Sequence, residues 1–309
     1  MNKKVLVFGS YVTDLCFRCD RFPVAGETVK GNSFRLGPGG KGSNQAVAAH
    51  RAGADVVFVT KLGDDDLGKT ALSFYHDEGI NTDRILIESN GETGAAMICV
   101  DEKTAQNQIV VYNGACGRIS ESDTSLIYPL VDQAAYLLTQ LETNLEPVYA
   151  LLKYAHDRGV ITIVDPAPAS KVDLNMWQYV DIVKPNETEA EFFTGVKIRS
   201  MEDAARAAKV FRELGVKCVI ITMGERGCYV CNENDETYIE PANCGTVVDT
   251  TGAGDAFSGG FVAALAKGFE IISAVRYASV TAGLSITKVG TAPSMPYARQ
   301  IDEFFSRQA

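Results

Sequence analysis

The residues best suited to chemistry lie in the segment DTTGAGDAFSGGFVAALA, residues 249–266. Gly252, Ala253 and Gly254 put three small residues at the start of an evident helix, so free backbone N–H groups and the positive end of the helix dipole face outward. This arrangement predicts an anion site. Asp255 follows directly, and its carboxylate would repel a phosphate unless it takes a proton from an attacking hydroxyl while the amides hold the phosphoryl group. The local sequence leaves a second interpretation equally open, in which Asp255 only stabilises the first helical turn.

A second motif is the glycine-rich stretch GPGGKGSNQAVAA, residues 37–49. Its glycines allow the backbone to approach a ligand closely, and Lys41 and Asn44 offer donors to hydroxyl groups. The stretch does not follow the Walker pattern, which requires Ser or Thr after the lysine, because Gly42 stands there. A glycine-rich turn before a helix is weak support for any one function.

The segment GDDDLGKT, residues 63–70, is a literal Walker match that we reject. Asp64, Asp65 and Asp66 would point three negative charges at a polyphosphate, which opposes what that loop must do. We expect a turn and a helix N-terminus here, with aspartates capping free amides.

Two further motifs each follow an expected strand. In KPNETEAE, residues 184–191, Asn186 and Glu189 stand three apart at a helix start and could face one cleft. A neutral and an acidic oxygen suit a Mg²⁺ ion that keeps most of its waters, but the same pair also fits a capping box, and both can hold at once. TMGERG, residues 222–227, is either a nucleotide-contacting loop or a plain strand connection.

Charge and histidine content exclude several classes of protein. The 309 residues have a formal net charge of −10, which argues against nucleic-acid binding because phosphate contacts need clustered Lys and Arg. His50, His76 and His156 all lie on expected helices away from the motifs, which disfavours a hydrolase or a histidine-based transferase.

The eight cysteines predict neither a disulfide framework nor a metal site. Cys16/Cys19 and Cys228/Cys231 have C-x-x-C spacing, but both pairs lie in extended segments, where positions i and i+3 point to opposite faces. The apolar stretch after the first lysines is ended by Asp14 without a cleavage site, and no apolar run approaches membrane-spanning length. We therefore expect a cytoplasmic protein with reduced thiols.

The alternation of strands and helices predicts an α/β fold with a mostly parallel sheet and helices on both faces. The expected strands cover residues 4–9, 55–63, 134–140, 160–165, 181–186 and 217–222. The expected helices cover residues 43–54, 144–158, 187–194 and 201–214. Residues 94–101 and 107–115 read as a hairpin around the turn EKTAQ. We expect one domain over residues 1–309, with off-pattern segments at about 12–36 and 94–114 forming a small sheet as a lid over the ligand site.

In these motifs, and in their order, the chain resembles the PfkB family of carbohydrate kinases, of the ribokinase type, nearly from end to end. The stretch GETVKGNSFRLGPGGKGSNQAVAA is similar to the N-terminal signature of that family, and NETEAE, TMGERG and DTTGAGDAF are similar to its metal, nucleotide and catalytic signatures. The segment DTTGAGD is highly specific for the family. The resemblance implies a three-layer ribokinase-like fold with a β-sheet lid. It implies ATP-dependent phosphorylation of the C5 hydroxyl of a pentose, first of all D-ribose, with Mg²⁺, a K⁺ activator and a homodimer formed through the lid.

Carried over by position, the resemblance also implies the roles of individual residues. The base is Asp255, with Gly252, Ala253 and Gly254 as the anion hole. The sugar-binding positions, besides Asp255 itself, are Val12, Asp14, Gly40, Lys41, Gly42, Asn44 and Glu142. The nucleotide-binding positions are Asn186, Thr222, Gly224, Gly227, Gly254 and Ser279. Asn186 and Glu189 lie near the Mg²⁺-bound phosphates. The monovalent-cation positions, partly through main-chain carbonyls, are Asp249, Thr251, Ser285, Lys288, Gly290 and Ser294.

The chain departs from ribokinases at three places. Val12 replaces the Asn of the usual Gly-Ser-x-Asn-x-Asp segment, which removes a polar group from the sugar side. Asp165 replaces the Asn of the NPAPA segment, and Ser279 falls where a histidine is common beside adenine. A kinase for 2-deoxyribose, another sugar or a nucleoside is therefore the alternative. A non-catalytic sugar- or nucleotide-binding regulator is the competing class, and the intact Asp255 argues against it because binding alone needs no base.

Overall fold

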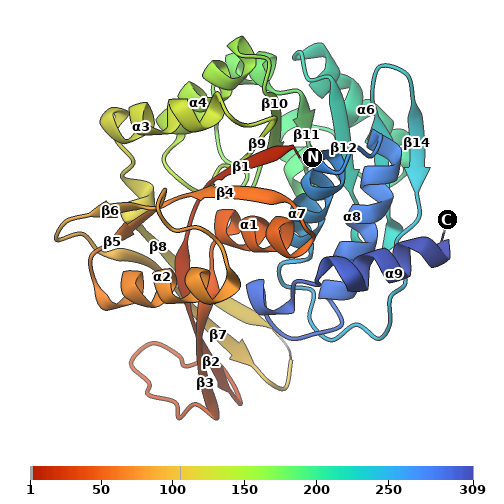
Figure 1. Cartoon of the computed structure of the whole chain (residues 1–309). Coiled ribbons are helices and arrows are strands. Elements are labelled where there is room, and N and C mark those ends of the chain that lie inside the picture. Colours follow the sequence, from red (N-terminus) through yellow and green to blue (C-terminus); the bar gives the residue numbers. More distant parts are fainter. Residues whose placement is uncertain (1–2, 105, 309) are drawn as a thin grey trace.

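The computed structural model describes residues 3–104 and 106–308 and is built around an eight-stranded sheet in the order β14-β13-β12-β11-β10-β9-β1-β4 (Figure 1). The strands are β1 (Lys4–Phe8), β4 (Asp55–Val59), β9 (Tyr136–Gln140), β10 (Ile161–Asp165), β11 (Ile182–Val183), β12 (Cys218–Thr222), β13 (Cys228–Cys231) and β14 (Glu236–Ile239). From β4 to β12 all neighbours are parallel, and β13 and β14 add an antiparallel edge. The expected α/β class with a mostly parallel sheet is confirmed.

The central strands are apolar on both faces because helices cover both. Val5 and Val7 of β1 pack into one core and Leu6 and Phe8 into the other, and all four are fully buried. This continuous apolar run is typical of a parallel strand inside a layered fold.

The helices divide between these two cores, as Figure 1 shows. One face of the sheet carries α1 (Lys41–Arg51), α2 (Asp66–Glu78), α7 (Ala253–Ala266), α8 (Ile271–Ser285) and α9 (Ala298–Gln308). The other face carries α3 (Glu121–Val131), α4 (Leu145–Asp157), α5 (Glu187–Thr194) and α6 (Met201–Glu213). Short 3-10 turns are η1 (Ala115–Gly117), η2 (Leu174–Tyr179), η3 (Gly224–Arg226) and η4 (Ala292–Ser294). Within the described residues no helix is long and apolar enough to span a bilayer.

A second, four-stranded sheet stands off the carboxyl end of β1 and projects at the bottom of Figure 1. Its strands, in the order β3-β2-β7-β8, are β2 (Val12–Cys19), β3 (Ser33–Gly39), β7 (Thr93–Asp101) and β8 (Asn107–Gly114). β2 and β7 are parallel, and the two outer pairs are antiparallel. The expected small sheet is thus present, although Ala105 of the expected turn lies outside the described residues.

Several local expectations hold and others shift. The expected strand 55–63 breaks at Thr60, after which β5 (Lys61–Gly63) pairs with β6 (Leu86–Glu88). Lys61, the first residue of β5, pairs through its ammonium group with Asp123 of α3 at 2.8 Å. The rejected Walker match is a turn and a helix start, where the Asp65 carboxylate accepts from the Gly68 amide at 2.8 Å. Helices α3, α8 and α9 were not among those expected.

The two C-x-x-C pairs lie in β-strands, as predicted. Cys16 and Cys19 are in β2, and Cys228 and Cys231 are in β13. All eight cysteines of the chain carry free thiols.

Candidate active site

The candidate site lies along the carboxyl ends of the parallel strands. Glu142 follows β9, Asp165 ends β10, Lys184 follows β11 and Thr222 ends β12. Since these strands are neighbours in one parallel sheet, residues far apart in the sequence meet at one edge.

Asp255 lies in the first turn of α7, but its side chain points toward α1. Gly252 precedes the helix with φ +78° and ψ 2°, a left-handed conformation that glycine adopts without strain. The Asp255 carboxylate is buried, and it accepts hydrogen bonds from the side-chain amides of Asn44 at 2.9 Å and Gln45 at 3.0 Å. The side chain is therefore held against α1 and does not cap the N-terminal amides of α7. The Ala253 amide donates to the Thr250 carbonyl at 3.2 Å, so the amides of Gly252 and Gly254 are the ones open to a ligand.

The electrostatic surroundings of Asp255 favour a proton acceptor of raised basicity. Burial raises the pKa of this carboxyl, and the ammonium group of Lys41 opposes that shift without cancelling it. Burial alone would lower the pKa of Lys41, but the carboxylates around it, led by Asp255, raise it above its usual range. A carboxylate with a raised pKa is a stronger base than an exposed one.

Glu142 fixes the start of α1. One carboxylate oxygen, Oε2, accepts from the backbone N–H of Lys41 at 2.8 Å and also from the Ser10 hydroxyl. An anion at a helix N-terminus is stabilised by the free amides there. The glycine-rich stretch is needed for close packing, because a Cβ on Gly42 would lie 2.5 Å from the backbone carbonyl carbon of Gly9.

Asp14 faces this cluster from the second sheet. Burial first, and then the charges of Glu142 and Asp255, raise the pKa of Asp14 to about 7. Gly39 opens the space that its carboxylate occupies, because a Cβ there would lie 2.2 Å from Asp14 Oδ1. The left-handed Gly40, with φ +87°, links β3 to α1 and so joins the two sheets at this point.

One buried polar atom in the cluster lacks a partner. Asn44 is 4 % exposed, and its Oδ1 accepts no hydrogen bond from the described part of the chain, although its Nδ2 donates to Asp255. An unpaired buried acceptor costs free energy unless a ligand satisfies it. The atom therefore suits the hydroxyl of a bound substrate.

Val12 forms an apolar wall beside Asp14. Positions 12 and 14 of β2 point to the same face of the strand. Val12 is buried, and a Cβ on the neighbouring Gly94 would lie 2.9 Å from Val12 Cγ1.

Asn186 and Glu189 form the capping box that was one of the two expectations for this motif. Asn186 Oδ1 accepts from the Glu189 amide and Glu189 Oε2 accepts from the Asn186 amide, both at 2.8 Å. Burial, and then the charge of Asp165, raise the pKa of Glu189. With one oxygen of each side chain used in the cap, the pair fits a metal ion held through water better than one held directly.

The expected nucleotide positions lie next to this capping box. Asn186 and Thr222 form a parallel β-bridge, and η3 follows from Gly224. Gly227 has φ +72°, and a Cβ there would lie 2.2 Å from the carbonyl oxygen of Ile239. Ser279 of α8 lies further along, beside Cys228 of β13.

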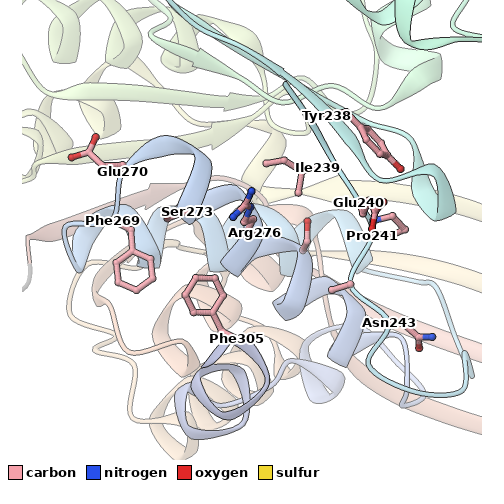
Figure 2. A pocket seen from close by; sticks show the side chains of 12 residues that line it. Tyr238, Ile239, Glu240, Pro241, Asn243, Phe269, Glu270, Ser273, Arg276 and Phe305 are labelled. Atoms are coloured by element: carbon pink, nitrogen blue, oxygen red, sulfur yellow. The ribbon is translucent and has the colours of Figure 1, made fainter. Parts of the chain in front are cut away.

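A groove of about 1080 Å³ runs between α8 and the segment that follows β14 (Figure 2). Ser279 lines it together with Pro241 and Ala242, and Arg276 and Phe305 line its far side. Ile239, which lines the groove, lies beside Gly227 of the loop after β12. The volume of the groove suits a small organic ligand of the size of a nucleotide.

The expected cation positions lie in two segments, residues 249–251 and 285–294. The Asp249 carboxylate links these two segments. Asp249 accepts from the amide of Thr251 through Oδ1 and from the amide of Gly290 through Oδ2, both at 3.0 Å. Burial would raise the pKa of Asp249, but these hydrogen bonds hold it below its usual range. Ser285 and Ser294 use their hydroxyls within their own turns, on the carbonyls of Ala282 and Thr291 respectively. With the Asp249 oxygens engaged, main-chain carbonyls are the available ligands, and carbonyl oxygens suit a weakly hydrated monovalent cation.

Three buried residues that contact the Asp255 region have no role predicted from the sequence. Gln45, Asp165 and Lys184 link to one another and to the first turn of α7. The sequence signal that could have identified Asp165 and Lys184 is their position at the carboxyl ends of two expected strands. These strands are neighbours in the sheet.

Comparison with known proteins finds similarity to sugar kinases along nearly the whole chain. The pfkB family carbohydrate kinase matches residues 2–298. The chain is 38 % identical over 304 residues to a ribokinase of Haemophilus influenzae, covering 98 % of this chain and 99 % of that protein. It is 32 % identical over 303 residues to a deoxyribokinase of Salmonella typhi, covering 98 % of each. The solved Arabidopsis thaliana ribokinase complexed with ribose and ATP superimposes with a TM-score of 0.91 at 28 % identity, covering 99 % of both chains.

Proposed function

Because the chain belongs to the pfkB family of carbohydrate kinases, we propose that it transfers the γ-phosphoryl group of ATP to the C5 hydroxyl of D-ribose, giving ribose 5-phosphate. It is a phosphotransferase with an alcohol group as acceptor. The observation that carries the proposal is the buried carboxylate of Asp255 at the N-terminus of α7, beside the backbone amides of Gly252 and Gly254. The relatives named ribokinase support ribose as the acceptor.

Asp255 acts as the general base in this mechanism. It accepts the proton of the C5 hydroxyl as the sugar oxygen forms its bond to the γ-phosphorus and the bond from that phosphorus to ADP breaks. The raised pKa of Asp255 increases its basicity. The N-terminal amides of α7 stabilise the negative charge on the transferring group, which is the part of such a transition state that a protein can stabilise most.

The sugar lies between β2 and the start of α1. Asp14 accepts hydrogen bonds from vicinal hydroxyls, and the unpaired Oδ1 of Asn44 accepts another. Gly40 and Gly42 let the chain pass close to the ring, and Lys41 and Glu142 border it. The small sheet acts as a lid that excludes water during transfer.

The nucleotide occupies the loop after β12 and the groove of Figure 2. Thr222, Gly224 and Gly227 contact its phosphate and sugar parts, and Ser279 contacts its base. A Mg²⁺ ion that accompanies ATP would neutralise phosphate charge, and Asn186 and Glu189 would hold it through water. A K⁺ ion held by the carbonyls around Asp249 would order the loop that leads into the anion hole.

A second acceptor, 2-deoxy-D-ribose, is favoured by Val12. An isopropyl group cannot hydrogen-bond a hydroxyl, and an apolar wall discriminates only weakly between a sugar and its deoxy analogue. The relative named deoxyribokinase agrees with this second candidate.

The lid also provides the surface for a homodimer. Phe17, Phe34, Met97, Val110 and Tyr112 are between 42 and 63 % exposed, and the strand register puts them all on the face opposite Asp14. A contiguous apolar face of this kind suits a second copy of the chain. Val110→Asp should convert a dimer to a monomer in sedimentation velocity, whereas a parent chain that is already monomeric would contradict this part of the proposal.

We place the reaction in the cytoplasm, where ATP is available and free thiols stay reduced.

A coupled assay of ADP release across a sugar panel tests the function. We expect the highest kcat/KM with D-ribose, followed by 2-deoxy-D-ribose, and mass spectrometry should find the phosphate on C5. Binding of ribose and ATP without turnover of any sugar or nucleoside would instead support a non-catalytic regulator.

A further inference from the structure

Beneath Asp255 lies a buried pair of opposite charges that the mechanism above does not use. Asp165 is 3 % exposed and Lys184 is 5 % exposed. They stand at the carboxyl ends of the neighbouring strands β10 and β11, and Lys184 Nζ lies 3.0 Å from Asp165 Oδ2.

The Asp165 side of this pair reaches the base through one amide. Asp165 Oδ2 accepts from Gln45 Nε2 at 2.8 Å, and the same nitrogen donates to Asp255 Oδ1 at 3.0 Å. The orientation of the Gln45 side-chain amide is fixed, because its Nε2 donates to two carboxylates and its Oε1 accepts from Gln140 Nε2 at 2.7 Å. Asp165, Gln45 and Asp255 therefore form one oriented chain of hydrogen bonds.

The Lys184 side reaches the base through the backbone. Lys184 Nζ donates to the carbonyl oxygen of Gly254 at 3.1 Å, and Ser258 Oγ donates to the same oxygen at 3.0 Å. That carbonyl belongs to the peptide bond that joins Gly254 to Asp255. Ser258 Oγ also lies 3.1 Å from Asp165 Oδ2, which closes the network.

Stability is a poor explanation for this pair, because a buried ion pair loses in desolvation about as much as it gains in attraction. Precise placement of a base, in contrast, has a large effect on rate. We propose that Lys184 is a positioning residue, which fixes the carboxylate of Asp255 through Asp165 and Gln45 and fixes the Gly254–Asp255 peptide through the Gly254 carbonyl. The inference rests on the proposed kinase function.

The pair also sets the charge that Asp255 experiences. The charged groups facing Asp255 are Lys41 of α1, Asp165 of β10 and Asp14 of β2. Lys184 offsets the charge of Asp165. Removing Lys184 leaves Asp165 unbalanced, which raises the pKa of Asp255, whereas neutralising Asp165 leaves Lys184 unbalanced and lowers it.

The test uses two variants that should act in opposite directions on the pH profile. In Lys184→Met we expect kcat for ribose to fall about 10²-fold, with the sugar KM nearly unchanged, and the acidic limb of the kcat profile to move to higher pH. In Asp165→Asn the acidic limb should move to lower pH. Lys217→Met is the matched control, because it removes a lysine that pairs with Asp181 at 2.8 Å at the opposite end of the sheet. That control should keep the parent kcat and profile.

A Lys184→Met enzyme with the kcat of the parent and the same acidic limb of the kcat profile would overturn the inference. Acidic limbs that move in the same direction in both variants would also overturn it. If Lys184→Met does not fold, the test depends on Asp165→Asn. In that variant, an acidic limb at the same pH as in the parent would refute the effect of the pair on the pKa of Asp255. A parent enzyme that phosphorylates no sugar would refute the proposed function instead, so the two failures can be told apart.

Discussion

Sugar binding should depend on pH through Asp14. The pKa of this carboxyl in the free protein is raised to about 7, mainly by burial. The ionised form is the one that accepts two hydroxyl protons, so binding favours the carboxylate and should release a proton. The ionised fraction increases as pH rises through 7, and the sugar Kd should therefore decrease as pH rises.

The size of the effect follows from that pKa. With a pKa near 7, about a tenth of Asp14 is ionised at pH 6 and about nine tenths at pH 8, which predicts roughly tenfold weaker binding at pH 6. At pH 7 binding should release about half a proton per site, because about half of the carboxyls begin protonated.

Titration calorimetry without nucleotide, in two buffers of different ionisation enthalpy, measures both quantities. Asp14→Asn keeps the size of the side chain but should bind more weakly, with a flat pH dependence and no proton release. Asp64→Asn, an exposed substitution in the loop before α2, should behave as the parent. Equal affinity at pH 6 and pH 8, or the same proton release in Asp14→Asn, would refute the role assigned to Asp14.

Two further predictions concern the ion and the acceptor. Activity should be higher in K⁺ than in Na⁺ at matched ionic strength, and Asp249→Ala should abolish the difference because it unties the 249–251 segment from Gly290; equal parent rates in the two salts would remove the cation site. Val12→Asn should shift the ratio of kcat/KM toward D-ribose over 2-deoxy-D-ribose by about 1–2 kcal/mol, the scale of one hydrogen bond, and an unchanged ratio would show that position 12 does not contact the sugar.

The parts of the site that could be predicted are those that a short segment determines. The segment from Gly252 to Gly254 forms the N-terminus of α7 by itself, and Asp255 is joined to it by one peptide bond. The glycines at the start of α1 were identifiable for the same reason, since the close approach of Gly42 to Gly9 depends on the absence of a side chain.

The parts that could not be predicted depend on strand order. Asp165 and Lys184 meet only because β10 lies beside β11, and Gln45 reaches them only because α1 packs on that face of the sheet. The contact of Lys61 with Asp123, which is 62 residues further along the chain, likewise depends on how distant elements pack. Hydrophobic periodicity carries no information about such pairings.

The most direct test of the central claim is the kcat of Asp255→Asn, measured together with its affinity for ribose. If Asp255 is the base, kcat should fall by about 10²–10⁴ while sugar binding largely survives, because the amide keeps the shape of the side chain and cannot accept the proton. A kcat within about threefold of the parent would contradict the account, since removal of a working general base costs far more than that.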